Sequence, residues 1–97
     1  MKNIDEIKRK IEELKPLLKK RFKVKRIGVF GSYTRGEQKE ESDLDVLVEF
    51  YEPVSLLGLV RLENYLTDIL GVKVDVVPKK DVRAELRKRI LKETVYL

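Results

Sequence analysis

Three short apolar segments constrain the fold of this chain more than any other feature. They are residues 24–30 (VKRIGVF), 44–50 (LDVLVEF) and 72–77 (VKVDVV). Each is rich in β-branched residues and has the length of a β-strand. Gly31 follows the first segment, and Pro53 and Pro78 follow the other two. Because proline cannot donate to a strand's hydrogen-bond ladder, we expect the second and third strands to end at these prolines.

Segments with helical periodicity flank and separate the strands. Apolar residues spaced three and four apart predict a helix over about residues 3–20, with Asn3 or Asp5 near its start. Pro16 lies inside this segment and predicts a kink or a helix boundary. Residues 33–42 are polar and contain Gly36, which indicates a short helical turn followed by a loop.

Two further helices follow the second and third strands. Ser55 is a suitable N-cap for a helix that runs to about Leu70, where Gly71 favours a left-handed stop. Asp81 is a suitable N-cap for a last helix that runs to about Lys92.

The element order αβ(α)βαβα predicts an α/β (α+β) fold in one domain, residues 1–97, with a small mixed three-stranded sheet and helices packed on one face. A right-handed crossover through the middle helix makes the second and third strands parallel. The short link between the first and second strands makes that pair antiparallel.

Composition excludes several kinds of chemistry. The 97 residues contain no Cys and no His, so disulfides, zinc–thiolate sites, thiol nucleophiles and a histidine base are excluded. No stretch approaches the roughly 18 apolar residues of a membrane span. The N-terminus lacks the apolar region of a signal peptide, so we expect a cytoplasmic protein without a membrane partner.

The net charge of +5 leaves two interpretations open. Basic residues cluster at residues 19–26 and again at residues 79–89. Such clusters attract polyphosphates, RNA or acidic proteins. They are equally typical of the solvated surface of a highly charged protein.

Three aspartates interrupt the apolar strands in a consistent pattern. Asp43 and Asp45 are two residues apart, so alternation directs both side chains to one side of the second strand. Asp75 takes the corresponding side of the third strand, opposite its apolar face. The predicted strand directions bring all three carboxylates, together with Gly31 and Ser32, to one edge of the sheet.

This arrangement indicates metal-dependent chemistry on a nucleoside triphosphate. Clustered carboxylates repel one another, and hard oxygen ligands favour Mg²⁺. Three carboxylates allow two ions, which can act on the attacking and leaving oxygens of a displacement. Asp75 is best placed beside the incoming hydroxyl. Gly31, Ser32 and Arg35 are candidates for binding the triphosphate.

Structural interpretations of the same residues also exist. A Gly-Ser pair is a plain turn in most proteins, and two alternate aspartates are usually a solvated strand face. Asp75 could pair with Lys73 on the same side of its strand.

The run GSYTRGEQKEESDLDVLVEF, residues 31–50, resembles the signature of the polymerase-β-like nucleotidyltransferases, in which Gly-Ser precedes an Asp-x-Asp pair. The form GSxxRG…SDxDxxV is similar to that of the minimal nucleotidyltransferases (MNT), and the resemblance extends over nearly the whole chain. It implies that Gly31 and Ser32 bind the triphosphate and that Asp43, Asp45 and Asp75 bind metal and carry catalysis.

The resemblance also implies a partner and a reaction. MNT proteins pair with HEPN-domain toxins, which resemble RNases, in toxin–antitoxin systems. The implied activity is Mg²⁺-dependent transfer of AMP from ATP to a toxin tyrosine by a type VII-like antitoxin, with no nucleic acid required. Two alternatives stay open: an antitoxin that acts by contact alone, and a nucleotidyltransferase that modifies RNA or a small molecule.

The middle helix carries more apolar residues than one buried stripe needs. Leu56, Leu57 and Val60 are in excess of that stripe. They indicate either a surface for a partner or wide cover for the sheet.

Overall fold

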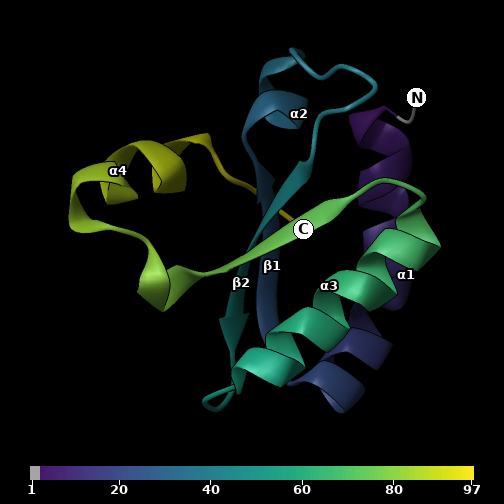
Figure 1. Ribbon diagram of the computed structural model, residues 1–97, viewed down its shortest axis with the longest axis vertical. Helices are drawn as coiled ribbons and strands as arrows, with labels where there is room; N and C mark the ends of the chain where they lie inside the picture. The colour runs from purple at the N-terminus through teal and green to yellow at the C-terminus, as the bar shows by residue number, and fades with distance from the viewer. Residues whose placement is uncertain (1–2) are drawn as a thin grey trace.

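A mixed four-stranded sheet organises the computed structural model, which describes residues 3–97 (Figure 1). The strands are β1 (Val24–Phe30), β2 (Leu44–Phe50), β3 (Val74–Pro78) and β4 (Val95–Tyr96), in the spatial order β3-β2-β1-β4. β1 and β2 are antiparallel, whereas β2 and β3 are parallel. The predicted α/β class, the mixed sheet and both strand directions are therefore confirmed.

The C-terminal tail adds a strand that the sequence did not reveal. β4 pairs antiparallel with β1, with Gly28 opposite Tyr96 and Val29 opposite Val95. A Cβ at Gly28 would lie 3.1 Å from the Val95 carbonyl oxygen, so glycine allows this close approach. The sheet has four strands instead of three because a two-residue strand is too short for a recognisable alternation.

Two helices cover one face of the sheet. α1 (Ile4–Phe22) and α3 (Leu56–Leu70) pack on the apolar side chains that alternate along β1, β2 and β3. The helical residues buried in this core are Ile7, Ile11, Leu18, Leu62, Leu66 and Leu70. Within each helix these residues recur at spacings typical of one buried helical face.

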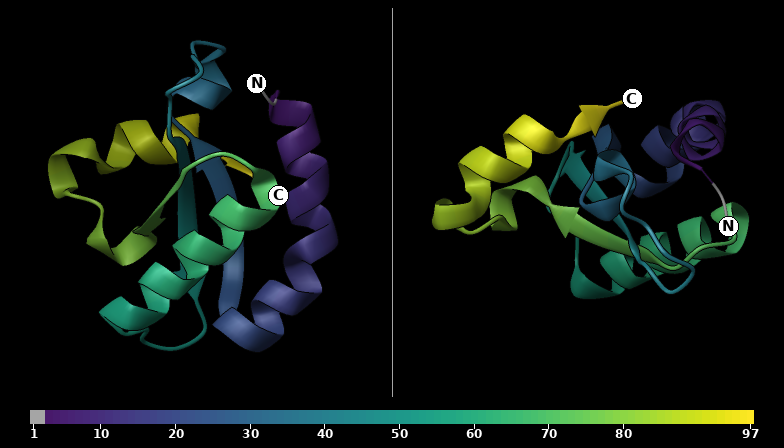
Figure 2. Two further views of the ribbon diagram at one scale, coloured as in Figure 1. Left: turned by 45° about the vertical axis from the view of Figure 1, so that its right-hand side comes forward. Right: turned by 90° about the horizontal axis from the view of Figure 1, so that it is seen from above.

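The last helix lies on the opposite face, which corrects the expectation that helices cover one face only. Figure 2 shows α4 (Ala84–Glu93) across the sheet from α1 and α3. Phe30, Leu47, Val82 and Ile90 are buried together there. The aspartate-bearing face is therefore partly apolar and needs a cover, because Leu47 lies two residues from Asp45.

The helix ends agree with the predicted caps at three positions. Asn3 Oδ1 accepts a hydrogen bond from Glu6 N at 2.9 Å, and Ser55 Oγ accepts one from Gly58 N at 3.1 Å. Gly71 ends α3 with φ 72°. No helix in residues 3–97 is both long and apolar enough to cross a membrane.

Two local expectations need correction. α1 does not end at Pro16, so the predicted helix boundary is absent there, because buried residues on both sides of the proline pack in the same core. Asp81 does not cap α4; it ends a 3₁₀ turn, η1 (Lys79–Asp81), and Val82 then takes an extended conformation before α4 begins. Burial of Val82 beneath the last helix explains this delayed start.

Candidate active site

Two of the three predicted carboxylates lie on directly paired residues. Asp45 in β2 is the register partner of Asp75 in β3, and partners in parallel strands direct their side chains to the same face. Asp45 is half-buried and Asp75 is exposed. Among the ion pairs of residues 3–97, none involves either aspartate or Lys73, so the alternative pairing of Asp75 with Lys73 is not formed.

Asp43 lies one residue before β2 begins and is exposed. Its charge acts on Asp45, which places it near the pair. Within residues 3–97, the His, Cys, Asp and Glu side chains form no group of three that could hold a metal ion as they stand. The structure thus assembles the pair Asp45 and Asp75, and the metal-binding role of all three aspartates stays a prediction.

The surroundings of Asp45 make its negative charge costly. Burial, followed by the charges of Asp75 and Asp43, raises the pKa of Asp45 from 3.8 to about 6. Arg35 opposes this increase, and Glu93 adds to it. A carboxylate held in this way gains from a nearby cation, which is the electrostatic property expected of a metal ligand.

A glycine turn lies directly against the Asp45 side chain. Phe30, the last residue of β1, is the register partner of Asp45, and Gly31 follows with φ 82°. A Cβ at Gly31 would lie 3.1 Å from Asp45 Cγ and closer still to Oδ2. Glycine is therefore required both for the backbone conformation and for the space, and the structure places this turn against Asp45 as predicted.

A single helical turn, α2 (Ser32–Arg35), carries the other predicted nucleotide-binding residues, Ser32 and Arg35. Tyr33 in this helix is 2% exposed and belongs to the main core. Burial, assisted by the Asp43 charge, raises the pKa of the Tyr33 hydroxyl. Thr34 Oγ1 also donates to the Gly31 carbonyl oxygen at 2.7 Å. The burial of Tyr33 and the Thr34 hydrogen bond hold this short helix beside Asp45.

A fourth acidic residue, Glu93 at the end of α4, joins the site. Its Oε2 accepts a hydrogen bond from Gly31 N at 3.0 Å, and its Oε1 accepts one from Arg35 Nη1. Burial alone would raise the pKa of Glu93, but these two hydrogen bonds and the Arg35 charge outweigh burial and lower it. The pattern of the sequence could not identify Glu93, because its position depends on the unpredicted strand β4.

Arg35 lies between two carboxylates. Besides its contact with Glu93, its Nε donates to Glu37 Oε1 at 2.8 Å. The hydrogen bonds to Glu37 and Glu93 raise the pKa of Arg35, so its positive charge is permanent. The site therefore combines a cation and a glycine turn with an aspartate pair, the groups needed to hold a triphosphate beside a metal ion.

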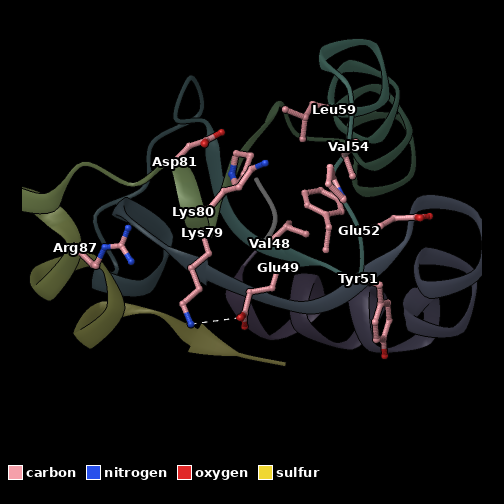
Figure 3. Close-up of a pocket in the computed structure, with 13 residues that line it drawn as sticks. Val48, Glu49, Tyr51, Glu52, Val54, Leu59, Lys79, Lys80, Asp81 and Arg87 are labelled. Atoms are coloured by element: carbon pink, nitrogen blue, oxygen red, sulfur yellow. Dashed lines mark hydrogen bonds and ion pairs between the residues drawn. The ribbon is translucent and has the colours of Figure 1, made fainter.

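A cavity of about 520 Å³ lies at the far end of β2, away from this site. Figure 3 shows that Glu49, Lys79 and Arg87 are among its lining residues, with Lys79 Nζ 3.4 Å from Glu49 Oε1. None of the six predicted site residues lines it. The candidate site therefore lies at the opposite end of β2 from this cavity.

Comparison with known proteins identifies the family of this chain. Residues 11–97 match the model of the nucleotidyltransferase domain family. The protein adenylyltransferase MntA of Thermococcus cleftensis is 46% identical over 97 residues, which cover 100% of this chain and 98% of MntA. A Methanocaldococcus jannaschii protein with the provisional name protein adenylyltransferase MJ1217 is 48% identical over 98 residues, which cover 100% of both chains.

Solved structures show the same fold. One that is provisionally described as a minimal nucleotidyltransferase has a TM-score of 0.83 at 38% identity, covering 99% of this chain and 97% of that chain. The MNT antitoxin in complex with a tri-AMPylated HEPN toxin of Shewanella oneidensis shares the fold at 20% identity, with a TM-score of 0.69 over 93% of this chain and 70% of that chain. This chain therefore belongs to the nucleotidyltransferase domain family and, within it, to the minimal nucleotidyltransferases.

Proposed function

We propose that this protein transfers AMP from ATP to a tyrosine hydroxyl of a HEPN-domain toxin and thereby acts as its antitoxin. One observation carries the proposal: the glycine turn lies against Asp45, the register partner of Asp75, in a chain that aligns end to end with a protein adenylyltransferase. The toxin partner is supported by the HEPN–MNT complex that shares this fold. The cytoplasmic location stays a prediction.

Each site residue then has a role in binding ATP. The Gly31 N–H, the Ser32 hydroxyl and the Arg35 guanidinium donate to oxygens of the triphosphate. Asp43, Asp45 and Asp75 would hold one or two Mg²⁺ ions, since Mg²⁺ binds one or two carboxylates together with water and substrate phosphates. Bound Mg²⁺ would supply the positive charge that the carboxylates and the triphosphate both lack.

The transfer is a displacement at the α-phosphorus. The tyrosine oxygen forms a bond to this phosphorus, and the bond between the α-phosphorus and the bridging oxygen of pyrophosphate breaks. Asp75 is exposed at the edge of the sheet, where it accepts the tyrosine proton. Arg35 stabilises the negative charge that develops on the leaving pyrophosphate.

A second candidate function is neutralisation by contact alone. It is favoured by an exposed apolar surface on α3, formed by Leu56, Leu57 and Val60 with exposed fractions of 77%, 59% and 41%. An exposed apolar patch is one of the features that mark protein–protein interaction sites. A toxin bound to this surface could be blocked without any chemical modification.

Toxin neutralisation by a variant that lacks the Asp43 and Asp45 carboxylates separates the two candidates. We would express the HEPN toxin with the wild-type chain, with Asp43→Asn/Asp45→Asn or with Asp68→Asn, and measure growth and co-purification. Asp68 is an exposed residue on α3 and is the matched control. Enzymatic neutralisation predicts that the double variant still binds the toxin but no longer restores growth. Restored growth with the double variant would favour contact alone.

A further inference from the structure

Glu93 occupies two of the groups assigned above to the triphosphate. The Gly31 N–H donates to one of its carboxylate oxygens, and Arg35 donates to the other. The Glu93 side chain is only 18% exposed, so this carboxylate is inserted into the site and does not lie on its rim. An anionic group of the protein thus lies where the substrate is expected to bring its own anionic groups.

The Gly31 N–H has a single hydrogen, so it can serve one acceptor well. A triphosphate oxygen that binds this N–H must therefore replace the Glu93 oxygen. Arg35 has five N–H donors, but two of its nitrogens already donate to Glu37 and Glu93. A carboxylate and a phosphate that share these donors also repel each other.

Release of Glu93 needs no unfolding. The backbone around it is held independently, because Thr94 N donates to the Ile90 carbonyl oxygen at 2.9 Å and Leu97 N donates to the Ile27 carbonyl oxygen at 3.0 Å. Rotation about the side-chain bonds of Glu93 is enough to vacate the turn. α4 and β4 can thus stay in place whether or not Glu93 binds Gly31.

We propose that Glu93 is an internal anion that occupies the triphosphate-binding donors of the free protein and is displaced by the nucleotide, so that it sets the affinity for ATP. This inference rests on the proposed function. The contact satisfies the Gly31 N–H and Arg35 when no nucleotide is bound. It also makes nucleotide binding weaker, because the binding-competent form is only a fraction of the free protein.

The test compares nucleotide affinity with the stability of the free protein. The probe is α,β-methylene-ATP with Mg²⁺, in which the bond that breaks during adenylyl transfer is replaced. Its dissociation constant is measured by calorimetry for the wild type, Glu93→Gln, Glu93→Ala and Glu37→Gln, and each Tm is recorded without nucleotide. Glu37→Gln is the matched control, since it removes a negative charge beside Arg35 and leaves the Gly31 N–H bonded to Glu93.

The expected result is tighter binding in a less stable protein. A hydrogen bond to a charged group typically favours the form in which Glu93 is bound to Gly31 and Arg35 by a factor of about ten. Glu93→Ala should therefore lower the dissociation constant of the nucleotide about tenfold. Glu93→Gln should lower it by less, because an amide oxygen can still accept from Gly31. Glu37→Gln should change it by no more than about twofold. The Tm of the free protein should fall in Glu93→Ala.

Several results would overturn the inference. Unchanged or weaker binding in both Glu93 variants would mean that Glu93 only positions Arg35 and the turn. If Glu37→Gln tightens nucleotide binding as much as the Glu93 variants do, the negative charge around Arg35 sets the affinity for the nucleotide, and the hydrogen bond of Glu93 to Gly31 does not. If the wild type binds the nucleotide and the Glu93 variants bind it no more tightly, only this inference is defeated. If no protein of the series binds the nucleotide, the proposed function is defeated as well.

Discussion

Replacement of Asp45 by asparagine should stabilise the metal-free protein above pH 6. The pKa of Asp45 is raised to about 6, chiefly by burial and by Asp75, so the folded state holds its proton more tightly than the unfolded state. The stabilisation from this proton is complete at low pH and is lost as the pH rises through about 6. The variant Asp45→Asn lacks the charge at every pH, so it avoids the destabilisation that the ionised wild type has at high pH.

The magnitude follows from the size of the pKa shift. The pKa of Asp45 rises from 3.8 to about 6. At about 1.4 kcal/mol per unit, this corresponds to an upper limit of about 3 kcal/mol. Asp45 is only half-buried, so solvent screening reduces the effect to about 1–2 kcal/mol. For a domain of this size, that is an increase in Tm of about 5–15 °C.

The assay is thermal unfolding in EDTA at pH 4.5 and pH 8. Asp45→Asn should exceed the wild type in Tm at pH 8, and the difference should shrink at pH 4.5. The control Asp68→Asn, on the exposed side of α3, should change the Tm little at either pH. An Asp45→Asn protein that is no more stable than the wild type at pH 8 would refute the electrostatic description of the aspartate pair.

Four further predictions concern other parts of the fold and site. Gly31→Ala should destabilise the protein by about 1–3 kcal/mol in chemical denaturation, because φ 82° disfavours alanine and its Cβ meets Asp45. Leu66→Ala in the buried core should cost about 2–5 kcal/mol in the same assay. Leu56→Asp/Leu57→Asp should leave the Tm nearly unchanged but weaken co-purification with the toxin, and unchanged co-purification would exclude this surface. Chelation of Mg²⁺ by EDTA should abolish transfer of AMP, and transfer that persists in EDTA would contradict a metal-dependent site.

The sequence predicted those parts of the fold that depend on local pattern. Alternation in β1 and β2 indicated both strands and the face of Asp45, and the caps Ser55 and Gly71 indicated the ends of α3. The crossover rule then made β2 and β3 parallel, which brought Asp45 and Asp75 together. The alternation of side chains along a strand and the right-handed crossover between parallel strands were thus enough to predict that Asp45 and Asp75 lie together.

The features that the sequence could not predict depend on contacts between distant segments. β4 is defined by its pairing with β1, and only this pairing brings Glu93 to Gly31, 62 residues earlier in the chain. α4 covers the second face because Leu47 and Phe30 are buried there, although the aspartates had suggested that this face is open. Tyr33 lies in the predicted helical turn, but the polar composition of residues 33–42 gave no sign that its side chain belongs to the core.

AMP transfer to a partner protein by the site at Gly31, Asp45 and Asp75 is measured by the intact mass of a HEPN toxin. The toxin is incubated with this chain, ATP and Mg²⁺, and with Asp43→Asn/Asp45→Asn and Asp75→Asn in parallel. We predict that the toxin gains the mass of one or more AMP units with the wild type and none with either variant. A toxin of unchanged mass that still binds the wild-type chain would contradict AMP transfer by this site.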